Sequence, residues 1–311
     1  MKPIEIGLVG IGKIARDQHI PALRANPRFH LAAAASRHTT VDGVKSFPTI
    51  EAMLDGCPAL DAVALCTPPQ AHYDAARLAL ARGKHVLLEK PPCGTTGQLD
   101  NLVAHARKVE RTLYQTWHSQ HAPGVEPAMR WLRARAIRHV RVRWMEDVRQ
   151  WHPGQTWIWR AGGFGVFDPG INAISILTRI LPMPFFVERA EMYIPSNCET
   201  PIAAEVLFKS DDGAAIQAAF DFRHAGVQTW DIEVETGDGM LKLSMGGAEL
   251  TVDGLPAAGT ACAPHSEYDS IYAHFADLIE SRRSDVQARP FQLVADIFLL
   301  AKRHTVEAFA E

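Results

Sequence analysis

A lysine at the end of a buried strand is the first residue that can do chemistry. It lies in Glu89-Lys90-Pro91-Pro92, directly after the apolar run His85–Leu88. Pro91 lacks a backbone N–H and biases Lys90 away from the helical region, so the strand ends there. A lysine in such a place can exchange a proton with a substrate oxygen. We predict that Lys90 is catalytic, and an exposed strand-end lysine is the alternative.

A second polar group follows the glycine run Gly162–Gly165. Asp168 fits the N-cap of a helix, and Pro169 fits its first helical position. Asn172 lies four residues after Asp168, so both side chains can face one side of the first turn. We predict that Asp168 and Asn172 are catalytic. The alternative for Asp168 is a helix cap with no chemical role.

A glycine motif follows the first apolar run of the chain. Gly10-Ile11-Gly12-Lys13-Ile14-Ala15 reads G-x-G-x-x-A. The first glycine makes the turn, the second lets the backbone approach a pyrophosphate, and the small third residue lets helix and strand pack closely. The free N–H groups of the helix start then face the phosphates. We predict dinucleotide binding by Gly10, Gly12, Lys13 and Ile14, and a turn used only for packing is the alternative.

The end of the second strand indicates which dinucleotide is bound. It reads Ala34-Ala35-Ser36-Arg37, and no acidic residue occurs before Asp42. An NAD site usually has an acidic residue here for the ribose 2′-hydroxyl. An arginine can instead bind a 2′-phosphate through charge-assisted hydrogen bonds. We predict that Ser36 and Arg37 contact NADP, with NAD also accepted; a solvated Arg37 is the alternative.

Further cofactor contacts are predicted at the ends of the third and fourth strands, because ligands bind at the carboxyl ends of such strands. These candidates are Thr67, Pro68, His72, Glu89 and Lys90. His72 has a second interpretation, as an ordinary residue at a helix start.

Strands and helices alternate in the first third of the chain. Apolar runs are expected as strands at Ile4–Val9, His30–Ala35, Asp61–Cys66, His85–Leu88 and Thr112–Thr116, with helices such as Lys13–Ala25 and Ala71–Ala81 between them. This order predicts an α/β Rossmann domain with a doubly wound parallel sheet, spanning 1–119.

The pattern changes after position 119 to alternating strands, which predict a second α+β domain at 120–311. We expect a helix at Val125–Ala134 and a strand through Val140, Val142 and Trp144. Further strands are expected at Phe185–Ile194, Ile202–Phe208, Ala214–Phe222, Trp230–Glu235 and Met240–Leu243, followed by a last helix at Phe291–Ala308. Strands without intervening helices predict a largely antiparallel sheet.

The composition excludes several classes of function. The net charge is -3, from 32 basic and 35 acidic residues, which argues against nucleic acid or an anionic membrane as partner. No apolar run reaches the roughly 18 residues of a membrane span. The start of the chain indicates a strand and no signal peptide.

Cysteine and histidine spacing gives no metal or disulfide pattern. The five cysteines are scattered and form no CxxC pair; they are Cys57, Cys66, Cys93, Cys198 and Cys262. This is typical of reduced thiols in the cytoplasm. Among fourteen histidines, His118-x-x-His121 lacks a further ligand at metal spacing, so we predict no metal.

Three motifs together resemble a known family. Gly10–Ala15, Glu89-Lys90-Pro91 and Asp168-x-Gly170-x-Asn172 are similar to the glucose-fructose oxidoreductase/inositol dehydrogenase/MocA (Gfo/Idh/MocA) family. The segments Gly12–His19, Glu146–Gln155 and Gly165–Asn172 resemble its aldose 1-dehydrogenase branch. The resemblance covers essentially the whole chain.

This resemblance implies a Rossmann domain followed by an open-faced sheet domain that binds a sugar. It assigns the catalytic lysine to Lys90 and the catalytic aspartate to Asp168. Most members carry histidine where this chain has Asn172, whereas the aldose branch has asparagine. The branch implies oxidation of C1 of L-arabinose, D-galactose or D-fucose to the aldonolactone.

Further sugar-binding candidates are His118, Glu146, Trp151, His152 and Trp230. Glu146 lies in register with the apolar face of its strand, where a carboxylate is costly unless partnered. A sugar hydroxyl or a structural arginine is the expected partner. Tryptophan rings suit the C–H face of a pyranose, although they are more often core residues.

Two other functions remain as alternatives. One is an inositol or other sugar dehydrogenase of the same family, and the other is a non-catalytic NAD(P)-sensing regulator. A homodimer formed through the second-domain sheet is also expected.

Overall fold

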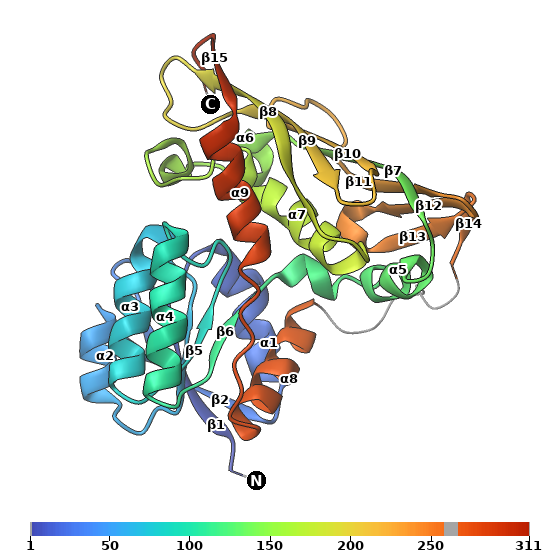
Figure 1. Cartoon of the computed structure of the whole chain (residues 1–311). Helices are drawn as coiled ribbons and strands as arrows, with labels where there is room; N and C mark the ends of the chain where they lie inside the picture. Colours follow the sequence, from blue (N-terminus) through green and yellow to red (C-terminus); the bar gives the residue numbers. More distant parts are fainter. Residues whose placement is uncertain (1, 258–266, 311) are drawn as a thin grey trace. The chain divides into compact units, whose positions relative to one another are not determined.

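The computed structural model describes residues 2–257 and 267–310, which belong to two compact units (Figure 1). The first unit comprises Met1–His118 and Pro264–Ala288, and the second comprises Ser119–Ala263 and Arg289–Glu311. Two continuous domains, 1–119 and 120–311, were expected. The division differs because the chain returns to the first unit late in the sequence. Cys262 lies outside the described residues.

A parallel sheet forms the centre of the first unit, as predicted. Its order is β3-β2-β1-β4-β5-β6. The strands are β1 (Ile4–Val9), β2 (Phe29–Ala35), β3 (Lys45–Phe47), β4 (Ala62–Leu65), β5 (His85–Leu88) and β6 (Leu113–Gln115). Every residue of β4 is buried, as expected for a strand covered on both faces.

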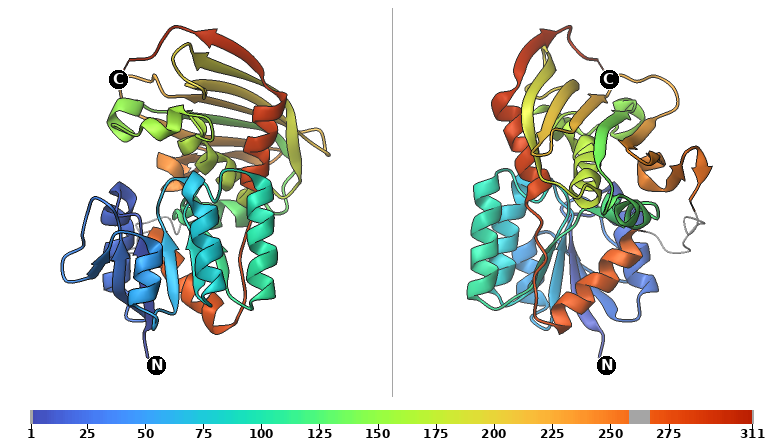
Figure 2. Two further views of the ribbon diagram at one scale, coloured as in Figure 1. Left: turned by 90° about the vertical axis from the view of Figure 1, so that its left-hand side faces the viewer. Right: turned by 45° about the vertical axis from the view of Figure 1, so that its right-hand side comes forward.

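Helices cover both faces of this sheet (Figures 1 and 2). One face carries α2 (Ile50–Gly56), α3 (Pro69–Ala81) and α4 (Thr96–Lys108), and the other carries α1 (Ile20–Ala25) and α8 (Glu267–Glu280). The side chains of Thr49 and Thr95 cap α2 and α4 by accepting N–H bonds from the first turn. The helix expected at Lys13–Ala25 contains a π-helical stretch, η1 (Ala15–His19), before α1.

Helix α8 completes the hydrophobic core of the first unit. Its residues Tyr272 and Phe275 are fully buried in one cluster with Ile6 and Leu8 of β1. Phe29 of β2 contacts both aromatic rings, edge-on at 5.4 Å for Tyr272 and stacked at 6.1 Å for Phe275. Burial of this apolar face explains why the chain returns to the first unit.

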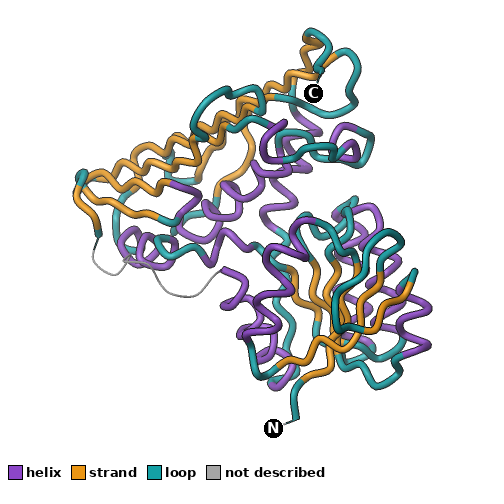
Figure 3. The backbone as a smooth tube through the Cα atoms, turned by 180° about the vertical axis from the view of Figure 1, so that it is seen from behind, coloured by secondary structure: helices purple, strands orange, loops and turns teal. Residues whose placement is uncertain are grey.

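A broad mixed sheet forms the second unit (Figure 3). Its order is β14-β13-β12-β11-β7-β10-β9-β8-β15. The strands are β7 (Ile137–Met145), β8 (Phe185–Pro195), β9 (Ala203–Ser210), β10 (Ala215–Asp221), β11 (Thr229–Thr236), β12 (Gly239–Ser244), β13 (Glu249–Val252), β14 (Leu255–Pro256) and β15 (Lys302–Val306). The prediction of a largely antiparallel sheet is confirmed, with parallel pairing only at β7–β10 and β8–β15.

Helices lie on one face of this sheet (Figures 1 and 2). They are α5 (Val125–Leu132), α7 (Phe167–Ile180) and α9 (Arg289–Leu300), with the short α6 (Val148–Trp151) near the end of β7. Short 3-10 turns are η2 (His118–His121), η3 (Thr156–Trp159) and η4 (Met245–Gly247). The other face of the sheet has no helix over it in the described residues.

Two predictions about helix ends are wrong. The last helix was expected to run to Ala308, but α9 ends at Leu300 and the chain becomes β15, which pairs with Glu191–Pro195 of β8. Asp168 was expected as an N-cap, but Val166 holds that place and no side chain caps α7. The helix begins earlier because Phe167 N–H and Asp168 N–H already bond to Phe164 and Gly165 carbonyls.

Gly165 permits this early start of α7, and replacing it tests how much its close approach to the Pro201 carbonyl matters for stability. Its φ is +51°, and a Cβ there would lie 2.2 Å from the Pro201 carbonyl oxygen. We expect Gly165→Ala to lower the free energy of unfolding by about 3–5 kcal/mol in urea unfolding. Gly213→Ala is the control, because Gly213 also has a positive φ, +85°, but a Cβ there would meet open space. This substitution should lower the free energy of unfolding by about 1–2 kcal/mol. Equal losses would show that the carbonyl contact is unimportant.

Candidate active site

The glycine turn after β1 fits a dinucleotide. Gly10 has a φ of +87°, and a Cβ on it would lie 2.8–2.9 Å from Thr67 and the Cys66 backbone. A Cβ on Gly12 would meet no atom within 4 Å, so the space above this residue is open. Thr67 Oγ1, at the end of β4, is buried without a hydrogen-bond partner in the described residues. An open cradle beside an unsatisfied hydroxyl is what a pyrophosphate requires.

Other predicted cofactor residues surround this turn. Ile14 is 37% exposed for a large apolar side chain, and Lys13 forms an ion pair with Asp17. Arg37 is exposed at the end of β2 and makes no hydrogen bond or ion pair with another described residue. Ser36 lies just before it and its hydroxyl accepts the N–H of His38 at 3.4 Å. The contacts of all four with the cofactor stay predictions.

His72 has a structural partner. It is fully buried on α3, and its Nδ1 lies 3.1 Å from the Pro92 carbonyl. Burial lowers the pKa of His72 and favours the neutral ring. His72 therefore helps to fix the segment after Lys90, and a contact with the cofactor stays a prediction; Pro68, also a candidate, directly precedes α3.

A buried carboxylate lies directly behind Lys90. Glu89 is 3% exposed, and its Oε2 accepts the backbone N–H of Lys90 at 2.9 Å. Oε1 accepts bonds from Tyr268 at 2.9 Å and Thr116 at 3.2 Å, and it lies 3.1 Å from His19 Nε2. Lys90 itself is half-buried. These donors fix the backbone that presents Lys90.

Burial alone would raise the pKa of Glu89. The hydrogen bond and positive charge of His19, the charge of His118 and the Lys90 N–H outweigh burial and lower the pKa to about 2. His19 is held in turn by Tyr272, whose hydroxyl lies 2.7 Å from Nδ1. Glu89 is therefore an internal anion at neutral pH.

Sequence reasoning missed most of this network. His19, Thr116, Tyr268 and Tyr272 were not predicted as site residues, although His19 lies in one of the segments that carry the family resemblance. The predicted residue His118 is close to it: Nδ1 lies 2.7 Å from Glu267 Oε2, and the ring stacks on Tyr268 at 6.0 Å. Its contact with a substrate stays a prediction.

The second unit gathers another polar cluster. Glu146, which follows β7, is 2% exposed; its Oε2 accepts Trp230 Nε1–H at 2.8 Å and its Oε1 lies 3.0 Å from His152 Nε2. The expected partner was a sugar hydroxyl or an arginine. Its partners among the described residues are an indole and an imidazole, so the arginine alternative is wrong and the sugar hydroxyl stays a prediction.

Two tryptophan rings adjoin this carboxylate. Trp151 of α6 and Trp230 of β11 are half-buried, with ring centroids 4.9 Å apart. Trp144 of β7 is buried and stacks behind Trp230 at 6.1 Å. The sheet therefore supports one ring while both keep exposed surface. Aromatic surface beside a fixed carboxylate can bind a polar ring compound.

Asp168 completes the cluster from α7. It is 4% exposed, and its Oδ2 lies 3.5 Å from His152 Nδ1. Asn172 is half-buried one turn later, and its backbone carbonyl accepts the Ser175 hydroxyl at 2.7 Å. The structure thus brings Glu146, Trp151, His152, Asp168 and Trp230 together in one unit.

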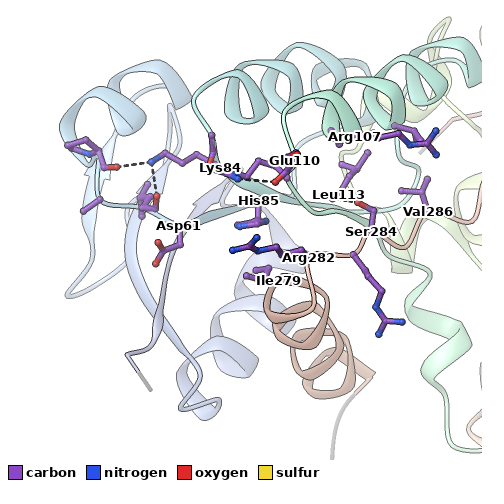
Figure 4. A pocket seen from close by; sticks show the side chains of 18 residues that line it. Asp61, Lys84, His85, Arg107, Glu110, Leu113, Ile279, Arg282, Ser284 and Val286 are labelled. Carbon is purple, nitrogen blue, oxygen red and sulfur yellow. Dashed lines mark hydrogen bonds between the residues drawn. The ribbon is translucent and has the colours of Figure 1, made fainter.

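The first unit contains a large hollow (Figure 4). Its volume is about 1150 Å³, and Asp61, His85 and Leu113 line it at the amino ends of β4, β5 and β6. Two of its cations donate to backbone carbonyls: Lys84 Nζ to Pro58 and Leu60, each at 2.7 Å, and Arg111 Nε to Gly83 at 2.6 Å. Candidate cofactor residues follow the opposite, carboxyl ends of the strands, so this hollow is not the candidate active site.

Residues 2–257 and 267–310 contain neither a group of side chains that could bind a metal ion nor a helix that could span a membrane. No group of three or more histidine, cysteine or acidic side chains there is arranged to bind a metal ion. No helix among these residues is long and apolar enough to cross a membrane.

Comparisons with known proteins agree on one family. Residues 4–116 match the model described as oxidoreductase family, NAD-binding Rossmann fold. Galactose 1-dehydrogenase of Pseudomonas fluorescens is 44% identical over 309 residues, 99% of each chain. The crystal structure of a D-galactose-1-dehydrogenase from Rhizobium etli is 51% identical, with a TM-score of 0.94 and coverage of 100% of this chain and 99% of that one.

A more distant structure shares the fold alone. It is a 3-ketoreductase from Actinomadura kijaniata in complex with TDP-benzene and NADP, at 22% identity and a TM-score of 0.83. The match covers 99% of this chain and 100% of that chain.

The Glu89 anion gives a prediction about stability and pH. Its pKa is about 2 in the folded protein against an ordinary value of 4.5, so its stabilisation is complete above pH 4.5 and is lost as the pH falls towards 2. We expect Glu89→Gln to lower the unfolding free energy at pH 7 by roughly 3 kcal/mol. The difference in unfolding free energy between Glu89→Gln and wild type should become smaller when urea unfolding is repeated at pH 4.

The exposed residue Glu126, paired with Arg130 and Arg179, provides the control. Glu126→Gln should change stability by less than about 1 kcal/mol at either pH. A pH-independent gap between Glu89→Gln and wild type would contradict the internal anion.

Proposed function

The chain belongs to the glucose-fructose oxidoreductase/inositol dehydrogenase/MocA family, and we propose that within this family it is an NAD(P)+-dependent D-galactose 1-dehydrogenase. As an oxidoreductase of this family, it is a dehydrogenase that acts on a CH–OH group. Full-length similarity to two galactose 1-dehydrogenases supports the choice of sugar. The observation that carries it is the fixed Glu146 carboxylate beside the half-buried rings of Trp151 and Trp230.

In the proposed reaction, C1 of the cyclic sugar loses a hydride and its hydroxyl loses a proton, which gives the aldonolactone. The bound dinucleotide supplies the hydride acceptor. Lys90 takes the hydroxyl proton, Asp168 tunes and positions Lys90, and Asn172 binds the reacting oxygen. The C1 hydroxyl belongs to a hemiacetal and is more acidic than an ordinary alcohol, so a lysine suffices as the base.

Glu89 supports this role without touching the substrate. Its Oε2 accepts the Lys90 backbone N–H. Three side chains lie against its Oε1, and one of them, His19, is held in turn by Tyr272. A catalytic group on a fixed backbone loses little free energy to orientation in the transition state.

The cofactor is proposed to lie over Gly10 and Gly12, with Arg37 at the adenosine ribose. Arg37 has no described partner that would compete with a 2′-phosphate. A guanidinium there favours NADP+ because its hydrogen bonds to the charged 2′-phosphate are stronger than those to the neutral 2′-hydroxyl of NAD+. NAD+ remains a substrate because the glycine turn serves both dinucleotides.

We further propose L-arabinose and D-fucose as substrates, since they share ring stereochemistry with D-galactose and differ only at C6. A cytoplasmic location and a homodimer formed through the uncovered face of the second sheet are part of the same proposal. Light scattering after gel filtration measures the oligomeric state.

Initial rates of reduced-dinucleotide formation, measured as the increase in absorbance at 340 nm, test the reaction. We expect D-galactose and L-arabinose to reduce NADP+, whereas D-glucose and myo-inositol react at least tenfold more slowly. Lys90→Ala should lower kcat by about 10²–10⁴-fold because the proton acceptor is lost. Lys108→Ala, at an exposed lysine that ends α4, should behave as wild type. Cofactor binding without reduction of any sugar would disprove the proposal.

Cofactor preference tests Arg37 separately. Arg37→Ala should raise KM for NADP+ by about ten- to a hundredfold, because a hydrogen bond to a charged group is lost. KM for NAD+ should stay within about twofold. The control is Arg107→Ala, an exposed arginine of α4 that lines the hollow at the other end of the strands. Parallel changes for both dinucleotides would place Arg37 away from the 2′-phosphate.

A further inference from the structure

His152 of the second unit lies between two buried carboxylates. Its Nε2 is 3.0 Å from Glu146 Oε1, and its Nδ1 is 3.5 Å from Asp168 Oδ2. The imidazole is 14% exposed, and the side chains of Glu146 and Asp168 are 2% and 6% exposed. Phe222 covers the ring at 5.4 Å between centroids. Water therefore has little access to the space between the three polar groups.

Glu146 determines which imidazole nitrogen carries hydrogen. The indole N–H of Trp230 can only donate, and it donates to Oε2 at 2.8 Å. The other carboxylate oxygen, Oε1, accepts from His152 Nε2. In a neutral ring with hydrogen on Nε2, Nδ1 has a lone pair and is an acceptor.

This tautomer places two acceptors opposite each other. Nδ1 is buried and makes no hydrogen bond in the described residues, although its 3.5 Å separation from Asp168 Oδ2 is an ion-pair distance. With a lone pair on Nδ1, the nitrogen and the carboxylate oxygen repel. One proton between them converts the contact into a charge-assisted hydrogen bond.

We propose that His152 is a positioning residue, which holds Asp168 in its working orientation by placing one proton between Nδ1 and the Asp168 carboxylate. The inference rests on the proposed sugar oxidation, in which Asp168 supports the proton acceptor Lys90. Glu146 and Trp230 serve the same end, because they fix the imidazole that holds Asp168. The shared proton is an ionisation that the pH dependence of kcat reports.

The charged groups around the ring are few in the described part of the chain. Glu146 faces it from the end of β7 and Asp168 faces it from α7. Asp147 and Arg149, on the same segment as His152, pair with each other at 2.8 Å. The proposed proton lies between His152 and Asp168, within the Glu146–His152–Asp168 set.

Two amide variants separate the two sides of the ring. In His152→Asn the amide lies near the place of Nδ1 and can donate to Asp168 without titrating. In His152→Gln the amide reaches towards the place of Nε2 and can donate to Glu146, so position 152 no longer donates to Asp168. His304→Gln is the matched control, because His304 pairs with the carboxylate Glu191 at 2.9 Å in the same unit and with no second carboxylate among the residues described.

The proposal predicts unequal effects on D-galactose oxidation. His152→Gln should lower kcat by about ten- to a hundredfold, as expected for loss of a hydrogen bond to a charged group, while KM for the sugar changes less than about threefold. His152→Asn should retain at least about fivefold more kcat than His152→Gln. Both variants should lose the alkaline limb of the wild-type kcat–pH profile, because the working form holds the proton and loses it as the pH rises, and His304→Gln should retain that limb.

Two kinetic outcomes would overturn the proposal. A rise in KM with kcat unchanged would make His152 a direct sugar ligand. Higher activity in His152→Gln than in His152→Asn would show that only the Glu146 side matters.

An NMR titration of ¹⁵N-histidine protein without ligands tests the shared proton independently of catalysis. The His152 signals are assigned by their absence in His152→Gln. A ring that carries hydrogen on both nitrogens and loses the Nδ1 hydrogen in one titration step supports the proposal. A ring that carries hydrogen on Nε2 alone at every pH down to the onset of unfolding contradicts it. This readout stands even if no sugar is oxidised, so failure of the proposed function is distinguishable.

Discussion

A buried carboxylate must be surrounded by hydrogen-bond donors, and this constraint organises the first unit. Glu89 takes its donors from three separate parts of the chain: His19 after β1, Thr116 after β6 and Tyr268 on α8. Removal of an ionised group from water costs several kcal/mol unless such partners are in place. The fold therefore has to bring α8 back to the sheet, and the same contacts fix the backbone at Lys90.

The second unit follows the same principle with different donors. Glu146 is satisfied by an indole from β11 and by the imidazole of His152, which directly follows α6. The sheet behind them has an apolar interior. Hydrogen bonds across strands and helices hold these side chains on rigid elements. Such support gives a recognition site its precision, because each ligand group meets a partner that is already oriented.

Much of the architecture could be predicted from local pattern, since β1 and β5 have the predicted bounds Ile4–Val9 and His85–Leu88. Continuous apolar runs between turn residues identify such strands. Helix α8 was missed and β15 was taken for helix because their partners lie far away in sequence: β15 pairs with β8, more than a hundred residues earlier. The same limit applies to the site: residue types indicated Glu146 and Trp230 separately, but their hydrogen bond spans 84 positions.

The discontinuous first unit also sets an order of events during synthesis. Its six strands are complete by Gln115, yet α8 emerges only after the whole sheet of the second unit except β15 has been translated. At about 5–20 residues per second, the interval is roughly ten to thirty seconds. Apolar side chains such as Ile6 and Phe29 lack their final cover throughout that time. The nascent chain therefore exposes apolar surface of an incomplete first unit, and chaperones bind surface of this kind.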